Sequence, residues 1–134
     1  MPKIKHIAIA TQDPDKTAKF YIDVFGMREI AKLDSPNAKG YYLSDGNINL
    51  AILDFQNDQV AGAEYGQNYS GIHHIGFQVD DLEVASRSLE AAQGKLLTAR
   101  ERVGTPREAT GRAESKWAGP DSVVIDISEP GWSV

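Results

Sequence analysis

A chain of 134 residues with 41% hydrophobic residues has the size and composition of one ordinary globular domain. It contains no cysteine, which excludes disulfides and thiolate metal ligands and leaves histidine and carboxylates as the strong ligand types. The net charge of −5 argues against nucleic acid or an anionic membrane as a partner. With no apolar stretch of membrane-spanning length and no secretory pattern at the start, we expect a cytoplasmic protein that binds a small molecule.

The first half of the chain reads as a strand, a helix and three further strands. The strand segment 6–10 opens with His6, and Asp13 follows as a helix cap with Pro14 at the first helical position. Apolar residues then recur at three-to-four spacing, which predicts a helix over 14–25, closed by Gly26 in the left-handed conformation. Strand character follows in residues 27–33, 40–44 and 47–53.

The second half repeats this order after a polar, glycine-rich stretch over 54–71 that we interpret as a linker. Asp80 and Glu83 resemble a capping box for a helix over 82–93, which Gly94 would close. Strand character appears in residues 74–79, 95–100, 113–118 and 123–128.

The two halves align as an internal repeat. His6-Ile7 falls on His74-Ile75 at an offset of 68 residues, and Gly26 falls on Gly94 in the same register. We therefore predict an α+β fold of two βαβββ modules related by a pseudo-twofold axis, whose curved sheets form a ligand-binding cleft. The single domain would span 1–134, with module 1 over about 1–54, a linker over about 55–71 and module 2 over about 72–134.

Histidines at equivalent positions are the first candidates for chemistry. Strands that face a shared cleft would aim His6 and His74 into it from opposite sides, as two nitrogen ligands of a metal ion. A lone histidine at a strand start more often only binds a nearby loop, so the matched pair carries this hypothesis. His73 points to the opposite face by strand alternation and is interpreted as a surface or packing residue, or an indirect partner of the site.

Asp126 is the third candidate ligand. In the last strand Val123, Ile125 and Ile127 share one face, so Asp126 lies on the other. A buried carboxylate costs several kcal/mol unless it is paired or binds a cation. Metal ligation is favoured over an ion pair with an arginine from the loop at 101–112, and His6, His74 and Asp126 together make a two-histidine, one-carboxylate set.

The long irregular stretch 101–112 is a candidate lid, because loops of this length in compact domains are commonly functional. Cationic residues gather in and beside this stretch. They could bind a carboxylate or phosphate of the substrate, but the preferred interpretation is a solvated surface. They are Arg100, Arg102, Arg107, Arg112 and Lys116. Tyr41 and Tyr42 alternate across a strand, so one of them should face the cleft, more plausibly for packing than for substrate binding.

Four segments together resemble the vicinal oxygen chelate superfamily, which includes glyoxalases, methylmalonyl-CoA epimerases, bleomycin-resistance proteins and extradiol dioxygenases. The resemblance covers nearly the whole chain and is carried by KHIAI at 5–9, TAKFY leading to FGM at 17–27, HHIGFQVDD at 73–81 and GPDSVVIDI at 119–127. It implies the fold predicted above and metal ligands at His6, His74 and Asp126. It also implies a homodimer, in some members with exchanged halves.

The resemblance has two departures. The ligand in the last strand is typically Glu but is Asp126 here, and the fourth ligand position holds Ala51. Three-ligand members, the extradiol dioxygenases and fosfomycin-modifying transferases, match this number of ligands better. The extradiol enzymes use an additional histidine, and the fosfomycin enzymes have a threonine where this chain has Ala8, so neither pattern fits completely.

The leading hypothesis is a small-molecule lyase, isomerase or dioxygenase that uses one divalent ion, Fe, Mn, Ni, Co or Zn, to bind two adjacent substrate oxygens. The alternative is a metal-free binding protein that sequesters a ligand, as bleomycin-resistance proteins do; Ala51 and the shorter Asp126 favour it. The catalytic acid or base is not assigned by the sequence, and Glu114 and Glu129 are guesses from position.

Overall fold

The computed structural model describes residues 1–62, 64–99 and 114–134. The predicted lid over 101–112 and the arginines at 100, 102, 107 and 112 lie outside the described residues. Contacts divide the chain into two compact units. Unit 1 comprises Met1–Lys5 and His74–Trp132, and unit 2 comprises His6–His73 and Ser133–Val134.

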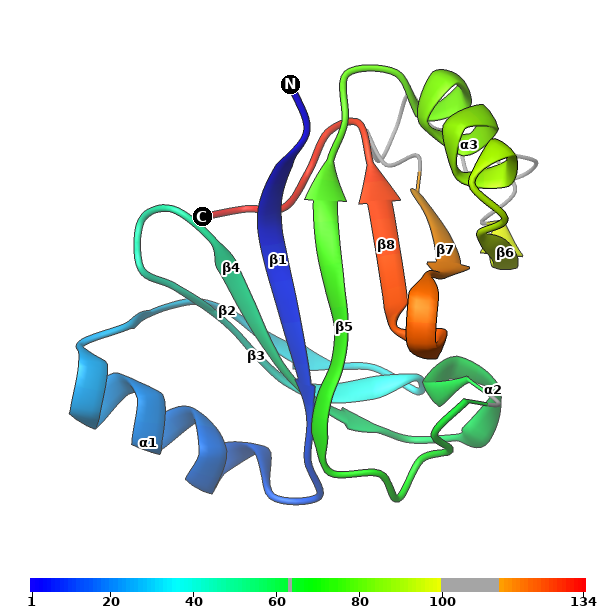
Figure 1. Ribbon diagram of the computed structural model, residues 1–134. Helices are drawn as coiled ribbons and strands as arrows, with labels where there is room; N and C mark the ends of the chain where they lie inside the picture. Colours follow the sequence, from blue (N-terminus) through cyan, green and yellow to red (C-terminus); the bar gives the residue numbers. More distant parts are fainter. Residues whose placement is uncertain (63, 100–113) are drawn as a thin grey trace. The chain divides into compact units, whose positions relative to one another are not determined.

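The order of elements confirms the α+β class and the βαβββ order of each half (Figure 1). The first half contains β1 (Lys3–Ala10), α1 (Pro14–Phe25), β2 (Arg28–Asp34), β3 (Ala38–Ser44) and β4 (Asn49–Phe55). The second contains β5 (Gly71–Gln78), α3 (Leu82–Ala91), β6 (Lys95–Ala99), β7 (Glu114–Ala118), a 3₁₀ turn (Pro120–Ser122) and β8 (Val124–Ser128). The strands hydrogen-bond in the order β2-β3-β4-β1-β5-β8-β7-β6.

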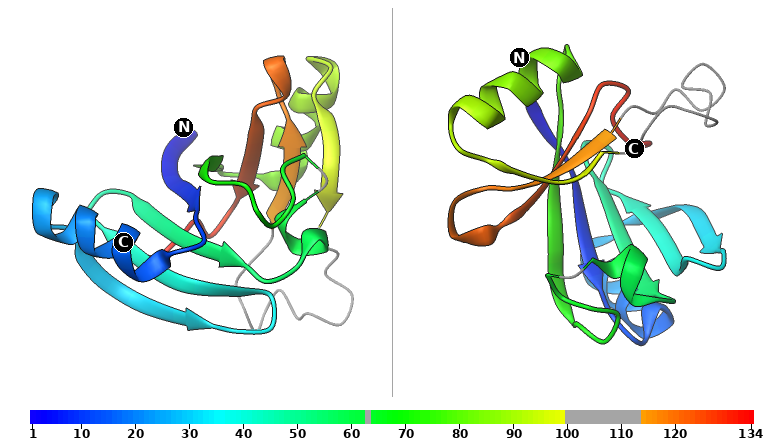
Figure 2. Two further views of the ribbon diagram at one scale, coloured as in Figure 1. Left: turned by 90° about the horizontal axis from the view of Figure 1, so that it is seen from below. Right: turned by 90° about the vertical axis from the view of Figure 1, so that its right-hand side faces the viewer.

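Helix α1 forms where the sequence predicts it, and both of its caps act as expected. The Asp13 carboxylate accepts a hydrogen bond from the Lys16 amide at 3.1 Å, and Gly26 ends the helix at φ 68°. The helix lies along one face of the strands of unit 2 (Figure 2). There Ala18 packs with Leu43 and Ile52 of the sheet. The other face of the same strands is therefore left for the second core of unit 2.

Helix α3 departs from the prediction at both ends. Asp81, not Asp80, caps it by accepting from the Val84 amide at 3.0 Å, whereas Asp80 binds the N-terminal amine at 2.9 Å. The left-handed residue after the helix is Gln93 at φ 66°, not Gly94. The Gly94 amide instead donates to the Leu89 carbonyl at 2.7 Å, a Schellman closure one residue earlier than expected.

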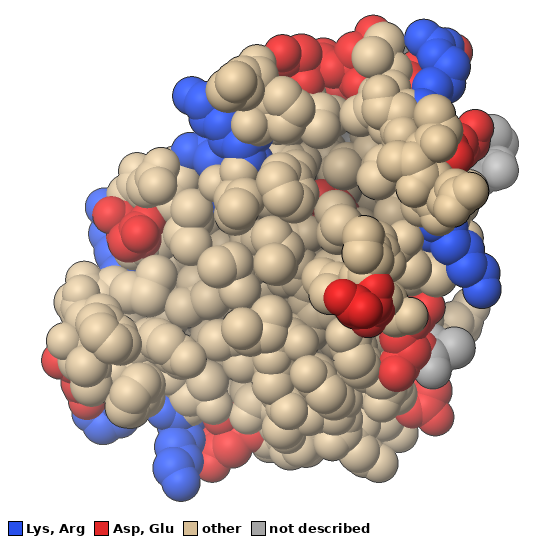
Figure 3. Space-filling model, in the orientation of Figure 1, with Lys and Arg blue, Asp and Glu red and all other residues tan. Residues whose placement is uncertain are grey.

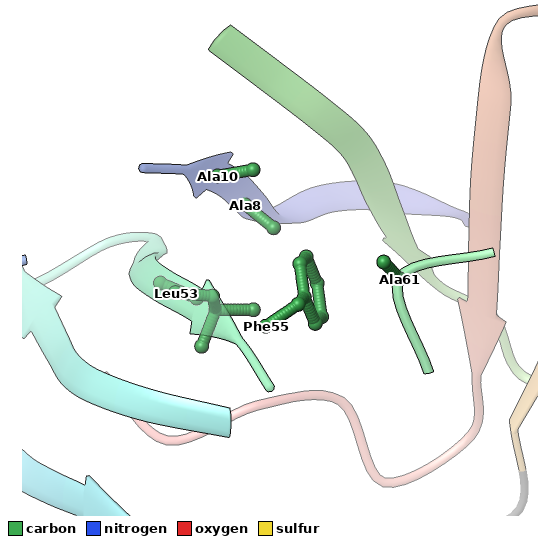
Figure 4. Close-up of a cluster of buried hydrophobic side chains, with 6 residues drawn as sticks. Ala8, Ala10, Leu53, Phe55 and Ala61 are labelled. Atoms are coloured by element: carbon green, nitrogen blue, oxygen red, sulfur yellow. The ribbon is translucent and has the colours of Figure 1, made fainter. Parts of the chain in front are cut away.

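The stretch between the halves is more ordered than a plain linker. Strand β4 continues to Phe55, and a short helix α2 (Asp58–Ala61) follows, capped by Asn57, whose side chain accepts from the Val60 amide at 2.9 Å. Ala61 packs against Phe55 and the small residues of β1 and β4 (Figure 4). This cluster fills the face of unit 2 that is opposite α1.

Unit 1 has its own core beneath α3. Leu82 of the helix and Val79 pack with Trp117 and Ile127, which belong to β7 and β8. The side chains that alternate with Trp117 and Ile127 along these two strands lie on the opposite face, among them Lys116 and Asp126. The packing of α3 thus fixes which face of unit 1 carries the charged residues.

Gly40 supplies a test of the β3–β4 pairing. It stands opposite Leu53 at φ 148°, and a Cβ built there would lie 1.8 Å from the Ile52 carbonyl oxygen. Gly26 also has positive φ, but a Cβ there would meet nothing within 4 Å. We expect Gly40→Ala to lower the free energy of unfolding by about 3 kcal/mol or more, and Gly26→Ala by only about 1 kcal/mol. Urea unfolding of both variants checks this, and equal small losses would contradict the close approach.

Candidate metal centre

Asp126 occupies the middle of a row of residues that crosses three strands of unit 1. It pairs with Gly76 of the parallel strand β5 and with Lys116 of the antiparallel strand β7. Its side chain lies on the face opposite Ile125 and Ile127, as strand alternation predicted. Only 6% of the residue is exposed, so its charge requires partners inside the fold.

A lysine and a histidine, which is cationic when protonated, hold the Asp126 carboxylate. His74 Nε2 lies 3.2 Å from Oδ2, and Lys116 Nζ lies 2.6 Å from Oδ1. The sequence grouped Lys116 with the loop cations and named a loop arginine as the alternative partner of Asp126. In the described part of the chain the partner is Lys116, which belongs to strand β7 rather than to the loop.

The separation of His74 and Asp126 suits metal coordination as well as a hydrogen bond. Two ligand atoms that each lie about 2.0–2.2 Å from one ion are themselves about 3.0–3.5 Å apart. The observed 3.2 Å between Nε2 and Oδ2 falls in that interval. A nitrogen and a carboxylate oxygen are also the donors that first-row divalent ions accept. The residues therefore fit a divalent ion without a change in this distance.

His6 belongs to unit 2, where Asn49 fixes its ring. Asn49 Nδ2 donates to the Ser133 carbonyl at 3.0 Å, so the amide oxygen faces His6 Nδ1 at 2.8 Å. Because that oxygen can only accept, Nδ1 carries the proton in the neutral ring, and Nε2 carries the lone pair. Both residues are buried, His6 at 3% and Asn49 at 0% exposure. A histidine oriented in this way is typical of a metal ligand.

The two histidines occupy the same place in strands of equal length. His6 is the fourth residue of β1 and His74 the fourth of β5, and each strand has eight residues. The prediction that they stand at the strand starts was wrong by three positions, because the extended backbone begins before the apolar pattern does. Their equivalence within the repeat is confirmed by this matching position.

His73 points away from the face of His74 and is part of a core. It is 2% exposed, its Nε2 donates to the Ala61 carbonyl at 2.6 Å, and its ring lies 4.7 Å from that of Phe55. Tyr65 and Tyr69 pack around the same ring. Of the predicted roles, packing is confirmed and a surface position is wrong.

Ala51 and the adjacent residues Tyr41 and Tyr42 lie on the neighbouring strands β4 and β3. Ala51 is fully buried between Ala8 and Tyr42 in register and carries no donor atom. Tyr42 packs against the cluster of small residues on the His6 face. Tyr41 lies on the other face, where the Asp15 carboxylate accepts its hydrogen bond and raises the pKa of the Tyr41 hydroxyl.

The two guessed bases have different positions. Glu129 accepts a hydrogen bond from the Leu82 amide at 2.8 Å and so stabilises the start of α3. Glu114 lies two residues before Lys116 in β7 and shares its face by alternation. The sequence did not identify Asn49 or Lys116 as parts of the site, because their roles depend on the pairing of β4 with β1 and of β7 with β8.

Charged groups are interspersed rather than gathered on the face that Figure 3 displays, where lysines and arginines alternate with acidic residues around the margin. The described helices include none that is long and apolar enough to cross a membrane.

Comparison with known proteins identifies the family. The model of the Glyoxalase/Bleomycin resistance protein/Dioxygenase superfamily matches residues 3–121. The chain belongs to this superfamily. Curated relatives in it include human mitochondrial methylmalonyl-CoA epimerase, 26% identical over 76% of this chain and 60% of that protein, so this chain spans about three fifths of its length. Lactoylglutathione lyase of Haemophilus influenzae is 31% identical over 70% of each chain.

Solved structures show the same superfamily fold. A hypothetical protein from Bacillus halodurans C-125 has a TM-score of 0.73 at 19% identity and covers 99% of this chain and 97% of its own. A variant of Streptomyces coelicolor methylmalonyl-CoA epimerase in complex with 2-nitronate-propionyl-CoA has a TM-score of 0.70 at 23% identity, covering 95% and 96%. The curated relatives of this superfamily member are thus enzymes, an epimerase and a lyase.

The tautomer of His6 can be tested without any metal. In the metal-free protein at about pH 8, where imidazoles are neutral, long-range ¹H–¹⁵N NMR should report a protonated Nδ1 in His6. Asn49→Ala removes the acceptor and should shift the ring toward the other tautomer, whereas Asn49→Asp keeps an acceptor and should preserve Nδ1–H. The same tautomer in the wild type and in Asn49→Ala would show that Asn49 does not orient the ring.

Proposed function

We propose that this chain is a divalent-metal-dependent isomerase or lyase, in which His6, His74 and Asp126 hold one metal ion. The single domain predicted over 1–134 would then build one site from both halves of the repeat. The observation that carries the proposal is the buried pair of His74 and Asp126, whose donor atoms are separated as two ligands of one ion would be. Among the described residues, these three histidine and carboxylate side chains form the group that could jointly bind a metal ion.

The reaction class follows from the donor set and from the relatives. A divalent ion with three protein ligands keeps positions for two adjacent substrate oxygens and stabilises the negative charge that forms when a neighbouring proton is removed. Proton transfer of this kind is the chemistry of an epimerase or a lyase, the two activities named for the curated relatives. Methylmalonyl-CoA and lactoylglutathione are therefore the first substrates to assay. The candidate ions are Fe, Mn, Ni, Co and Zn, and metal analysis of the loaded protein will show which of them is bound.

Metal analysis tests the proposal directly. Protein purified without a histidine tag should carry about one divalent ion per chain by plasma mass spectrometry, since three protein ligands suffice for one ion. His6→Ala, His74→Ala and Asp126→Ala should each lose it while circular dichroism shows a folded chain. Asp80→Ala, which removes an exposed carboxylate elsewhere in unit 1, is the matched control and should keep the ion.

A second function is favoured by two observations. Lys116 already neutralises Asp126, and Ala51 has no side-chain donor for a fourth ligand, and both agree with a metal-free protein that sequesters a small molecule. Such a protein would contain no metal even after reconstitution and would bind its ligand equally well in the presence of a chelator. The same metal analysis therefore separates the two functions.

Glu114 is the proposed base in the enzyme. Its position two residues from Lys116 on the same face of β7 puts it about 7 Å along the strand from the lysine. Glu129, the other candidate, is engaged with the start of α3. For a substrate that the wild type converts, we expect Glu114→Gln to lower kcat about 100-fold while the metal content stays unchanged. A comparable loss in Glu129→Gln, or none in Glu114→Gln, would reject this assignment.

A further inference from the structure

Lys116 places a positive charge beside a carboxylate that the proposed site needs for its ion. The ammonium lies 2.6 Å from Asp126 Oδ1, and the pair is fixed by strand register, because the two residues stand directly opposite each other in β7 and β8. The lysine side chain is 23% exposed, compared with 8% for the aspartate. The carboxylate is thus held in place, whereas the flexible lysine stem has access to solvent.

The charges of the site do not balance once an ion is bound. Two neutral imidazoles and one carboxylate offset only one of the two charges of a divalent ion, and Lys116 adds another positive charge beside it. A metal ion and an ammonium group on one carboxylate repel each other strongly in a partly buried site. Either the lysine must weaken metal binding, or a further anion must join the loaded site.

We propose that Lys116 changes partner. In the metal-free protein its ammonium holds Asp126, and in the loaded protein it pairs with the negative charge of a ligand that binds the ion through two adjacent oxygens. This proposal rests on the proposed metal site and names the ligand class for it: small anions with neighbouring oxygens, at least one of them carrying charge. Ala51 contributes no donor atom that would compete with such a ligand.

The first experiment measures metal affinity. Zinc is titrated calorimetrically at one fixed pH into metal-free wild type, Lys116→Met and Lys116→Arg. The methionine keeps the length of the side chain without its charge, so this variant should bind zinc about tenfold more tightly or better. Lys116→Arg keeps the charge and should bind zinc within about threefold of the wild type. Circular dichroism of each variant verifies the fold.

The second experiment measures anion binding to the zinc-loaded proteins. Oxalate, a dianion with adjacent oxygens, is compared with oxamide, which has a similar shape but no charge. Wild type and Lys116→Arg should prefer oxalate, and Lys116→Met should lose about tenfold or more of the oxalate affinity while its weaker oxamide affinity is unchanged. Metal-free wild type should not bind oxalate, because Lys116 is then engaged with Asp126.

The outcomes separate this proposal from the proposed function. If none of the proteins binds zinc, the metal site itself is wrong. If the wild type binds zinc but Lys116→Met binds it no more tightly, Lys116 does not compete for Asp126 and the partner change is overturned. Equal oxalate affinity in loaded wild type and loaded Lys116→Met likewise overturns the assignment of the ligand class.

Discussion

The candidate site depends on one buried negative charge, that of Asp126 in the middle of β8. An isolated carboxylate in this position would cost several kcal/mol, so the strands on either side must supply a cation or a hydrogen-bond donor. Lys116 does so from β7 and His74 from β5. A shift of one residue in either pairing would turn the partner side chain to the core beneath α3. The buried charge of Asp126 therefore requires the observed strand register of unit 1.

The two halves of the repeat share an architecture but carry different side chains beside their equivalent histidines. The first half presents small and apolar side chains on the face of His6, Ala8 and Ala51 among them, and Asn49 holds the histidine. The second presents a histidine beside an ion pair of Asp126 and Lys116. The repeat thus places a histidine at the same strand position in each half, whereas the buried ion pair described here belongs to the second half.

Sequence patterns predicted those features that depend on neighbours along the chain. The capped helix α1, the order of helices and strands along the chain and the face of Asp126 follow from local periodicity and were confirmed. The errors at α3 arose because Asp80 and Asp81 are equally good caps in sequence, and Gln93 could replace a glycine in the left-handed position. The contacts of Asn49 with His6 and of Lys116 with Asp126 were missed because they depend on strand pairing, and the sequence patterns did not show that pairing.

The ion pair also gives Asp126 a partner that is part of the protein itself. In a structural zinc site the ion is part of the folding free energy, and its ligands would repel or lack partners in its absence. Here Lys116 neutralises Asp126, and Asn49 satisfies the protonated nitrogen of His6, so both side chains have partners inside the protein. If the proposed ion binds to them, the stability of the fold would not depend on it, and the affinity for the ion could follow the needs of the ligand rather than those of the fold.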